Sequence, residues 1–468
     1  MPASKLTRSF YGLAAGEAVA RVLSFIASLV IARRLGPAMY GVIGVASGIV
    51  LYLNQLADAG IELSGVPAVA RTREGLSALV SSTLTVRVSI ALALTVIVVL
   101  VGSSALPQPD GSILALYALG LVFIAAGTRW VFVGMQRTTW VGGARIGGEL
   151  VALAIVLVAV RGVGDVAAVP IAAVVGAALS AFAMLIGLRS FGVRVVPRFA
   201  WTTSRPLFER GPHLVGFTLL GLVLFNADLI YLRFISGQAS AGYYSAAYTF
   251  IAFAANLSVA WAHSVMPSLA SIDKTDSQRN AVFETALLLA YVVALPVAVG
   301  GMLTARPLMG LVFGPAFLPA VAALVWLLPS VPIAAVREIA VVGLIGSPGG
   351  ERKLIRINAT CAIFNIAILL PVVPRYGMVG AAAVTVLTEI LRLFLAYRFA
   401  SQEGFSTPAL SRFMKPTLAA AAMVPALVFA ADLPFMLLLV TGAAVYAVIL
   451  FVTGVLRFQR PFQVRLVV

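Results

Sequence analysis

Apolar stretches of about 20 residues follow one another along most of the chain, separated by short polar connectors. Within each stretch the apolar residues are continuous, which is typical of membrane-spanning helices and not of the alternating strands of a barrel. A helix of this length crosses the roughly 30 Å hydrocarbon core of a bilayer. We therefore expect an all-α integral membrane protein with about fourteen transmembrane helices. These are placed at residues 10–32, 38–62, 79–101, 112–135, 144–160, 166–188, 213–235, 241–267, 282–305, 317–342, 356–373, 378–399, 414–431 and 434–456.

A turn near the start of the chain recurs in its second half. Gly36-Pro37-x-x-x-Gly41 is matched by Gly237-Gln238-x-x-x-Gly242, and each turn opens an apolar helix. One half of the molecule is therefore predicted to be a distant copy of the other. Many transporters are built in this way, with polar groups on the inner faces of the two halves.

The longest polar connector follows the sixth span and contains five arginines. We read it as a linker between two pseudo-symmetric six-helix lobes, to which a C-terminal helical hairpin is appended. Its charge is interpreted as setting orientation and attracting anionic lipid headgroups, not as a ligand site. The predicted domains are an N-terminal lobe at 1–188, a basic cytoplasmic linker at 189–212, a C-terminal lobe at 213–400, and two additional helices with a basic tail at 401–468.

Composition supports the membrane assignment. The 468 residues are 61% hydrophobic and only 11% charged, whereas soluble domains carry about 25% charged residues. The net charge of +16 does not indicate nucleic-acid binding, because the basic residues are scattered between the apolar stretches. With a cytoplasmic N-terminus, about 22 of the 33 lysines and arginines fall on the cytoplasmic side and about five outside. Both termini are therefore predicted to be cytoplasmic.

Several kinds of chemistry find no support in the sequence. One cysteine, Cys361, and two histidines leave almost no soft metal ligands, and no phosphate-binding G-x-x-x-x-G-K-[ST] motif occurs. No outside loop is long enough for a catalytic domain. We expect no enzyme activity, no catalytic residues, no cofactor and no metal site.

Four arginines fall inside predicted spans: Arg21, Arg87, Arg129 and Arg337. An arginine in the bilayer centre costs at least about 2.5 kcal/mol, so it usually faces a protein interior or a watery cavity. Guanidinium groups bind phosphate bidentately. We therefore take these four as candidates for binding an anionic group such as a phosphate in a central cavity.

Each of these arginines also has a structural interpretation. Arg21 shares a helix face with Glu17, Ser24 and Ser28, and Glu17 is its expected partner in a structural ion pair. Arg87 and Arg129 have no acidic neighbour at helical spacing, so their structural partners would be Glu17, Asp58 or Glu149 on other helices. For Arg337 the structural interpretation is a self-satisfying pair with Glu338, as for Arg392 with Glu389, although Glu338 follows Arg337 directly and is expected to point elsewhere on the helix. Trp130 is interpreted as a membrane-interface anchor.

Carboxylates in the spans provide candidates for ion coupling. Asn54, Asp58 and Glu62 have the spacing i, i+4, i+8, which predicts one helix face. Asp58 and Glu17 are candidates for holding a coupling Na⁺ or H⁺; a structural role for both stays open. Arg145 and Glu149 at i, i+4 are expected to form a structural pair.

Several motifs together resemble a known family. The second span is preceded by Leu35-Gly36-Pro37 and Tyr40-Gly41 and ends in Asp58-Ala59-Gly60. This pattern resembles the Wzx-type polysaccharide transporters, which are lipid-linked oligosaccharide flippases of the multidrug/oligosaccharidyl-lipid/polysaccharide (MOP) superfamily. The resemblance continues in the same order through the chain, with Asp228 and Gly242-Tyr243-Tyr244, Phe313-Gly314-Pro315-Ala316-Phe317, and Tyr376-Gly377-Met378-Val379-Gly380-Ala381.

The resemblance implies two six-helix bundles with a cavity that opens alternately to either side of the membrane. It also makes Asp228 the second-lobe ion-coupling candidate. The implied function is flipping an undecaprenyl-pyrophosphate-linked oligosaccharide across the bacterial inner membrane, and the implied ligand of the four arginines is its pyrophosphate. Implied partners are this lipid-linked substrate, a coupling Na⁺ or H⁺, membrane lipids and polysaccharide assembly enzymes, but no nucleic acid. A drug/cation antiporter of the same superfamily and a membrane polysaccharide polymerase or glycosyltransferase remain the alternatives.

Overall fold

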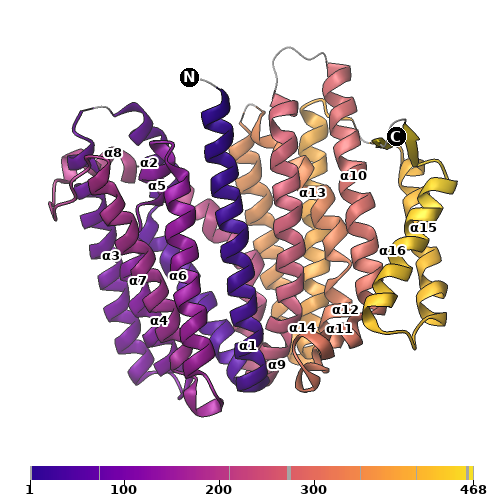
Figure 1. The fold of residues 1–468 in the computed structure, drawn as a ribbon, viewed down its shortest axis with the longest axis horizontal. Helices are drawn as coiled ribbons and strands as arrows, with labels where there is room; N and C mark the ends of the chain where they lie inside the picture. Colours follow the sequence, from indigo (N-terminus) through magenta and orange to yellow (C-terminus); the bar gives the residue numbers. More distant parts are fainter. Residues whose placement is uncertain are drawn as a thin grey trace. The chain divides into compact units, whose positions relative to one another are not determined.

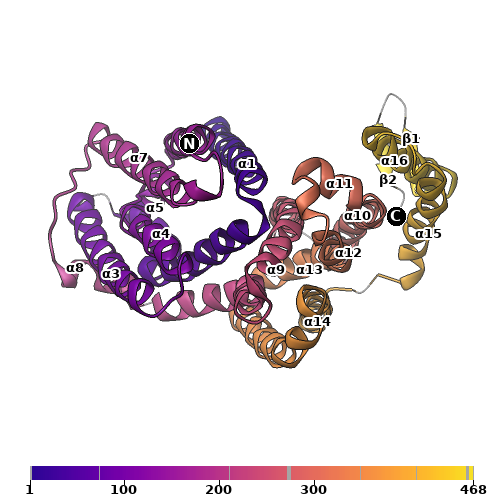
Figure 2. The ribbon, with the colours of Figure 1, turned by 90° about the horizontal axis from the view of Figure 1, so that it is seen from below.

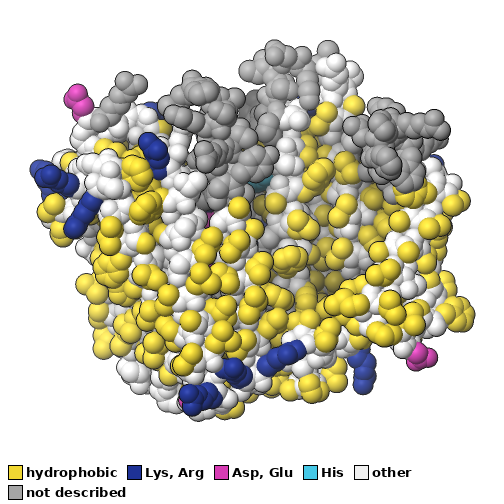
Figure 3. Space-filling view, in the orientation of Figure 1, with side chains coloured by type: hydrophobic (Ala, Val, Ile, Leu, Met, Phe, Trp, Pro, Cys, Tyr) yellow, Lys and Arg dark blue, Asp and Glu magenta, His cyan; other side chains and the backbone are white. Residues whose placement is uncertain are grey.

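The computed structural model describes residues 3–72, 74–209, 211–270, 276–347, 349–406, 408–459 and 463–466. These residues form sixteen α-helices, two 3₁₀-helices and one short antiparallel hairpin of β1 (Leu456–Gln459) and β2 (Gln463–Leu466) (Figure 1). The expected all-α membrane fold is confirmed. On the face drawn in Figure 3, hydrophobic side chains cover the middle of the helices, and lysines and arginines lie toward the helix ends.

Three of the helices are bent pairs. In α1 (Ala3–Asp58), α9 (Gly211–Ala270) and α14 (Gly350–Gln402), one glycine leaves the helical conformation, at Gly36, Gly237 and Gly377 respectively. Within the described residues, eleven helices are long and apolar enough to cross a membrane, and the three that contain these bends span 49 to 57 residues. At 1.5 Å per residue each of the three is more than twice the bilayer thickness. Counted as two crossings each, they bring the total to about fourteen, as expected.

The repeated turn has the same backbone conformation in both copies. Gly36 has φ 73° and ψ 176°, and Gly237 has φ 87° and ψ 176°, a region that only glycine occupies readily. The two turns also touch. A Cβ on Gly41 would lie 2.2 Å from the Gln238 carbonyl oxygen, and one on Gly242 would lie 1.8 Å from that of Pro37. Glycine is thus required here for backbone conformation and for close approach.

Contacts divide the chain into two compact units, 1–242 and 243–468. The helix at 211–236 therefore packs with the first unit, although the repeated turn makes it the counterpart of the first helix of the chain. The Tyr52 hydroxyl donates to the Leu222 carbonyl at 2.8 Å and helps to hold it there. The predicted lobe boundaries at 188 and 213 remain predictions.

The first unit consists of the α1 pair, the start of α9 and a set of shorter helices. One core lies where α1, α3 and α4 meet, around Val42, Ala91 and Leu121. A second surrounds Trp130 at the end of the unit where α2, α5 and α8 lie (Figure 1). The remaining elements are α2 (Ile61–Arg71), α3 (Leu76–Ser104), α4 (Asp110–Ala125), α5 (Arg129–Gly134), α6 (Thr138–Ala159), η1 (Val163–Asp165), α7 (Ala168–Ser190) and α8 (Trp201–Phe208).

The second unit contains the predicted appended hairpin. Figure 2 shows α15 and α16 side by side. They pack on α10 through Met423 and Tyr446, whose hydroxyl donates to the Val292 carbonyl at 2.8 Å. The bounds in this unit are α10 (Asp276–Leu303), α11 (Ala305–Val312), η2 (Pro315–Phe317), α12 (Ala320–Leu327), α13 (Ser330–Ile345), α15 (Leu410–Phe429) and α16 (Phe435–Val452).

Candidate functional site

The predicted polar face of the second span is broken by a turn. Helix α1 ends at Asp58, Ala59 and Gly60 have φ 49° and 78°, and Glu62 lies in the next helix, α2. The expectation that Asn54, Asp58 and Glu62 share one helix face is therefore wrong for Glu62. Its backbone N–H instead donates to Asp58 Oδ2 at 3.2 Å, so that Asp58 caps the start of α2.

Arg87 and Asp58 form a buried ion pair. Their residues are 2% and 6% exposed, and Arg87 Nη2 lies 2.9 Å from Asp58 Oδ1 without the alignment of a hydrogen bond. Arg87 Nη1 also donates to the Gly127 carbonyl at 3.2 Å, whereas its Nε is buried with no acceptor among the described residues. Arg87 therefore forms the expected structural pair with a carboxylate of another helix, Asp58.

Arg129 stands between two carboxylates. Its Nη1 lies 3.2 Å from Glu62 Oε2, and its Nε lies 3.8 Å from Glu17 Oε1. Arg145 Nη1 approaches the other oxygen of Glu17 at 3.2 Å. The expected Arg145–Glu149 pair is wrong, because Arg145 turns toward α1 and Glu149 accepts a 2.7 Å hydrogen bond from the Ser24 hydroxyl.

Arg21 is the most open of the four predicted arginines. It is exposed and makes no ion pair with any residue that the structure describes. The expected Glu17–Arg21 pair does not form, because Glu17 is taken by Arg129 and Arg145. Arg21 nevertheless lies one helical turn from Glu17 on the same face of α1.

Eight charged residues near the start of the first unit therefore balance one another in number. Four arginines and four carboxylates face one another across α1, α2, α3, α5 and α6, and their formal charges cancel. Spare hydrogen-bond donors remain on Arg21 and on the half-exposed Arg129, whose only side-chain hydrogen bond to a described residue is from Nη1 to Glu62. The members are Arg21, Arg87, Arg129 and Arg145 with Glu17, Asp58, Glu62 and Glu149.

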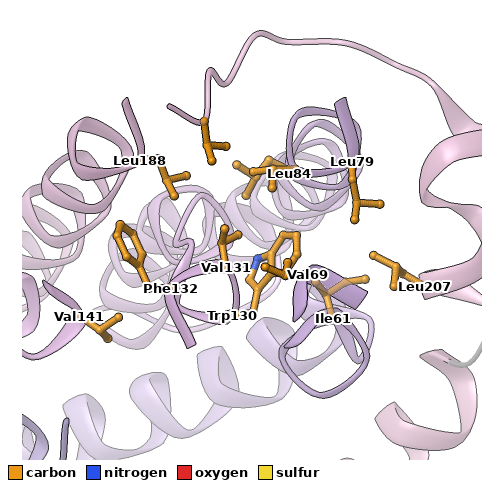
Figure 4. Packing of buried hydrophobic residues seen from close by; sticks show 12 residues of the cluster. Ile61, Val69, Leu79, Leu84, Trp130, Val131, Phe132, Val141, Leu188 and Leu207 are labelled. Atoms are coloured by element: carbon orange, nitrogen blue, oxygen red, sulfur yellow. The ribbon is translucent and has the colours of Figure 1, made fainter. Parts of the chain in front are cut away.

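The position of Arg129 is fixed by the packing of the residues that follow it, beginning with Trp130. The three residues after Arg129 in the short helix α5 are fully buried, and Figure 4 shows them among the side chains of the second core. Trp130 is 0% exposed, so the interpretation as an interface anchor is wrong. Its ring lies against α2, where a Cβ on Gly65 would come within 2.5 Å of Trp130 Cε3. Apolar packing of the following residues thus fixes the position from which Arg129 reaches its carboxylates.

Arg337 occupies a separate charge cluster in the second unit. It is 7% exposed, with Nη1 2.8 Å from Glu338 Oε1 and Nε 2.9 Å from Glu389 Oε2. Arg392 Nη1 approaches the other Glu389 oxygen at 2.6 Å. The expectation that Glu338 points elsewhere is wrong, whereas the alternative pairs of Arg337 with Glu338 and of Arg392 with Glu389 are present. Most residues of α13 around it are buried, so the two long side chains bend together to satisfy each other's charge.

Asp228 and Asn226 are buried in the first unit, at 3% and 8% exposed. Asp228 Oδ1 accepts the Leu229 backbone N–H at 2.8 Å. Asn226 Nδ2 is buried with no hydrogen-bond partner among the described residues, and a Cβ on Gly48 of α1 would lie 3.7 Å from its Oδ1. These contacts place Asp228 on the inner side of α9. Within the described part of the chain, no three histidine, cysteine or acidic residues are grouped to hold a metal.

The sequence did not predict one polar cluster. Asp110, at the first turn of α4, accepts two hydrogen bonds from Arg233, from Nε at 2.9 Å and from Nη2 at 2.6 Å. Gln238 Nε2 donates to the same carboxylate at 3.1 Å. An acidic residue in a first helical turn and an arginine inside a span were both visible in the sequence, but nothing in their spacing linked them.

Comparison with known proteins supports the fold. The chain is similar to the lipid II flippase MurJ in an inward closed conformation, with 14% identity, TM-score 0.79, and coverage of 94% of this chain and 98% of that one. An inward-facing multidrug resistance MATE family transporter of the MOP superfamily matches with 12% identity, TM-score 0.64 and coverage of 82% and 94%. A MOP superfamily transporter from Pyrococcus furiosus, described as having a binding pocket of reverse polarity, matches with 13% identity, TM-score 0.59 and coverage of 85% and 95%.

At such low identity these likenesses show the fold alone, and it is the MOP-type fold that the motifs led us to expect. No curated protein matches the chain in sequence. Residues 6–273, more than half of the chain, match the family described as polysaccharide biosynthesis protein. The matched range includes both copies of the repeated turn and the whole charge network of the first unit. The chain therefore belongs to the polysaccharide biosynthesis protein family.

Proposed function

We propose that this protein flips an undecaprenyl-pyrophosphate-linked oligosaccharide, the repeat unit of a polysaccharide, across the bacterial inner membrane by alternating access. Membership of a polysaccharide biosynthesis family and a fold shared with a lipid II flippase support this proposal. The physical task is to carry a polar, anionic headgroup past hydrocarbon while the isoprenoid tail stays in lipid. We place both termini in the cytoplasm, where polysaccharide assembly enzymes supply the substrate.

The observation that carries the proposal is the spare hydrogen-bonding capacity of Arg129 and Arg21. The Arg129 side chain is 43% exposed and donates only from Nη1 to a described residue, while the packing of Trp130 fixes its backbone. Arg21 is exposed on the adjacent face of α1. A phosphate needs such donors, and a planar guanidinium supplies two at once. We assign pyrophosphate binding to these two residues.

The other two predicted arginines have a supporting role in this proposal. Arg87 and Arg337 are buried and already hold carboxylates. Removing their charge would leave those carboxylates unpaired in the interior, so we assign Arg87 and Arg337 to positioning and not to direct substrate contact.

Ion coupling is assigned to three carboxylates. Asp58 and Asp228 are buried, and Glu17 shares its charge between Arg129 and Arg145. When a phosphate engages Arg129, Glu17 loses part of its compensation and becomes a site for H⁺ or Na⁺. Transport of the lipid-linked substrate in inverted vesicles is measured after the Na⁺ gradient and the proton gradient are dissipated in turn. The gradient whose loss stops transport identifies the ion. Unchanged transport without either gradient would contradict the coupling.

A drug/cation antiporter is the second candidate, and one observation favours it. The network of the first unit has no excess positive charge, because its four carboxylates balance its four arginines. A cationic drug would use Glu17 and Glu62 where a pyrophosphate uses Arg129. A membrane polymerase or glycosyltransferase has less support, since the similar solved structures are flippases and transporters.

Complementation of a flippase-deficient strain separates these candidates. Arg21→Ala and Arg129→Ala should each lower transport about ten- to hundredfold, because a hydrogen bond to a charged group is worth about 1.5–3 kcal/mol. Arg129→Lys should restore little, since lysine cannot bind bidentately. Arg375→Ala, which removes an exposed arginine of the second unit, is the matched control.

Protein levels in the membrane must be equal for this comparison. Normal transport by both alanine variants would remove the assigned site. A wild-type protein that fails to complement but exports cationic dyes would establish the antiporter in place of the flippase.

A further inference from the structure

The chain between α7 and α8 is bound along the side of α3. Residues 193–200 are extended, and three of their backbone N–H groups donate to hydroxyls on one face of that helix. These bonds are Arg194 to Ser77 Oγ at 3.1 Å, Val196 to Ser81 Oγ at 3.1 Å, and Arg198 to Thr85 Oγ1 at 3.0 Å. We call residues 193–208 the docked segment.

The match between the two backbones is geometric. Hydroxyls four residues apart on a helix are separated by about 6 Å along its axis. Alternate N–H groups of an extended chain are separated by about 6.6 Å. One helix face can therefore bond every second residue of the segment, and the register is fixed by the hydroxyls of α3.

This register decides which side chains face outward. Val193 is 4% exposed and Val195 packs against the second core. Arg194, Val196 and Arg198 lie on the opposite side of the extended chain and are exposed. From 194 to 198 this side alternates guanidinium and apolar groups, and from Pro197 onward the residues of the other side are exposed as well.

Helix α8 continues the same pattern. Its Ser204 is buried and shares a 3.0 Å hydrogen bond with Ser82 Oγ of α3, and Leu207 is buried beside it. Trp201 is 45% exposed, and Phe199, just before the helix, is 72% exposed. Large apolar groups that face outward are unusual for a polar connector, and aromatic side chains are typical of the membrane–water interface.

The docked segment lies at the depth of the lipid headgroups. Helix α3 has 29 residues, which span about 43 Å, whereas the hydrocarbon core is about 30 Å thick. The segment runs beside the first ten residues of α3, which are rich in serine and threonine. The part of α3 after Arg87 is predominantly apolar, with Ser89 and Thr95 as its polar residues before Gly102. The first turns of α3, and the segment bound to them, therefore belong to the interfacial layer.

Three of the four arginines at 189–205 have no acidic partner among the described residues. The side chains of Arg189, Arg194 and Arg198 are exposed and make no ion pair with the residues that the structure describes. Only Arg205 is neutralised, by Glu209 at 2.7 Å. Free guanidinium groups interleaved with exposed apolar side chains are the pattern of a segment that lies in an anionic membrane surface.

We propose that the docked segment and Arg189 form a binding site for anionic phospholipid headgroups. The three arginines pair with lipid phosphates, and Val196, Phe199 and Trp201 enter the boundary between headgroups and acyl chains. Because the segment is hydrogen-bonded to α3, the site anchors the first unit to the membrane surface. This inference does not depend on the transported substrate.

The test measures lipid binding by the purified full-length protein. Protein in detergent is titrated with phosphatidylglycerol or phosphatidylcholine, and bound lipid is counted by native mass spectrometry. The variant is Arg189→Gln/Arg194→Gln/Arg198→Gln. Each lost charge near an anionic surface is worth about fivefold, so the affinity for phosphatidylglycerol should fall about a hundredfold, whereas that for phosphatidylcholine should change little.

Two controls complete the experiment. Arg161→Gln/Arg306→Gln/Arg375→Gln removes three exposed arginines elsewhere and should leave phosphatidylglycerol binding within about twofold of wild type. Arg189→Lys/Arg194→Lys/Arg198→Lys keeps the charges and should retain binding. Equal loss in the two glutamine variants, loss in the lysine variant, or wild-type affinity in the first glutamine variant would overturn the proposal. So would binding of an acidic protein in place of lipid.

Discussion

Replacing Arg87 with methionine removes one half of the buried ion pair in the first unit while keeping most of the side-chain volume. Asp58 would remain 6% exposed and would lose the guanidinium that lies 2.9 Å away. Breaking a buried pair by deleting one partner typically costs about 3–5 kcal/mol, because an uncompensated charge stays in the interior. We expect Arg87→Met to destabilise the protein by that amount.

The expected size of the effect on melting follows from the length of the chain. At about 2.1 cal/mol/K per residue, cooperative unfolding of the whole protein has an entropy near 1 kcal/mol/K, so Tm should fall by about 3–5 °C. The assay is thermal unfolding of the purified protein in detergent, followed by light scattering and intrinsic fluorescence. Asp58→Leu should be destabilised by a similar amount, because Arg87 then loses its carboxylate.

The double variant Arg87→Met/Asp58→Leu decides the matter. With both charges removed, most of the lost stability should return, since hydrophobic replacement of a buried pair is often neutral. The coupling between the two single changes should exceed about 1 kcal/mol in a double-mutant cycle. An Arg87→Met protein that melts at the wild-type temperature, or two changes that simply add, would show that the pair is not buried as described. Normal transport by a stable double variant would confine Arg87 to positioning and would exclude Asp58 from ion coupling.

Three other predictions follow from close contacts in the first unit. Gly242→Ala places a methyl group 1.8 Å from a carbonyl oxygen, so the folded yield should fall sharply in size-exclusion chromatography, and a normal yield would contradict the contact. Arg233→Ala should lower Tm by about 2–5 °C, since it leaves the largely buried carboxylate of Asp110 without its ion pair. The charge-swapped variant Arg233→Asp/Asp110→Arg should recover part of this loss, and no recovery would exclude a direct pair. Gly65→Val should quench and red-shift the fluorescence of Trp130 as water enters around the ring, and an unchanged spectrum would show that the neighbouring backbone accommodates the side chain.

Much of the fold follows from the sequence. Hydropathy located the spans because the free energy of placing a polar group in hydrocarbon depends on each residue by itself. The two copies of the glycine turn were recognisable because a positive φ is a property of one residue, and Gly36 and Gly237 share it. The order of motifs and the repeat together predicted a MOP-type transporter.

The ion-pair partners of the charged residues could not be predicted from the sequence. Local spacing paired Glu17 with Arg21 and Arg145 with Glu149, whereas the structure joins Glu17 to Arg145 and to Arg129. The same limit hid the pair of Asp110 and Arg233, which are far apart in the chain. A residue's spacing along one helix does not say how that helix is rotated against its neighbours.

What the sequence alone determined, then, is where the chain crosses the membrane and where glycine lets it turn, because hydrophobicity and backbone freedom belong to single residues. Only the tertiary structure decided which arginines are saturated and which keep free donors. It placed Arg87 against Asp58 in the interior and left Arg21 exposed. The physical reason is that the charge balance at a site depends on the rotation and packing of several helices at once, and that packing is set by many distant apolar contacts.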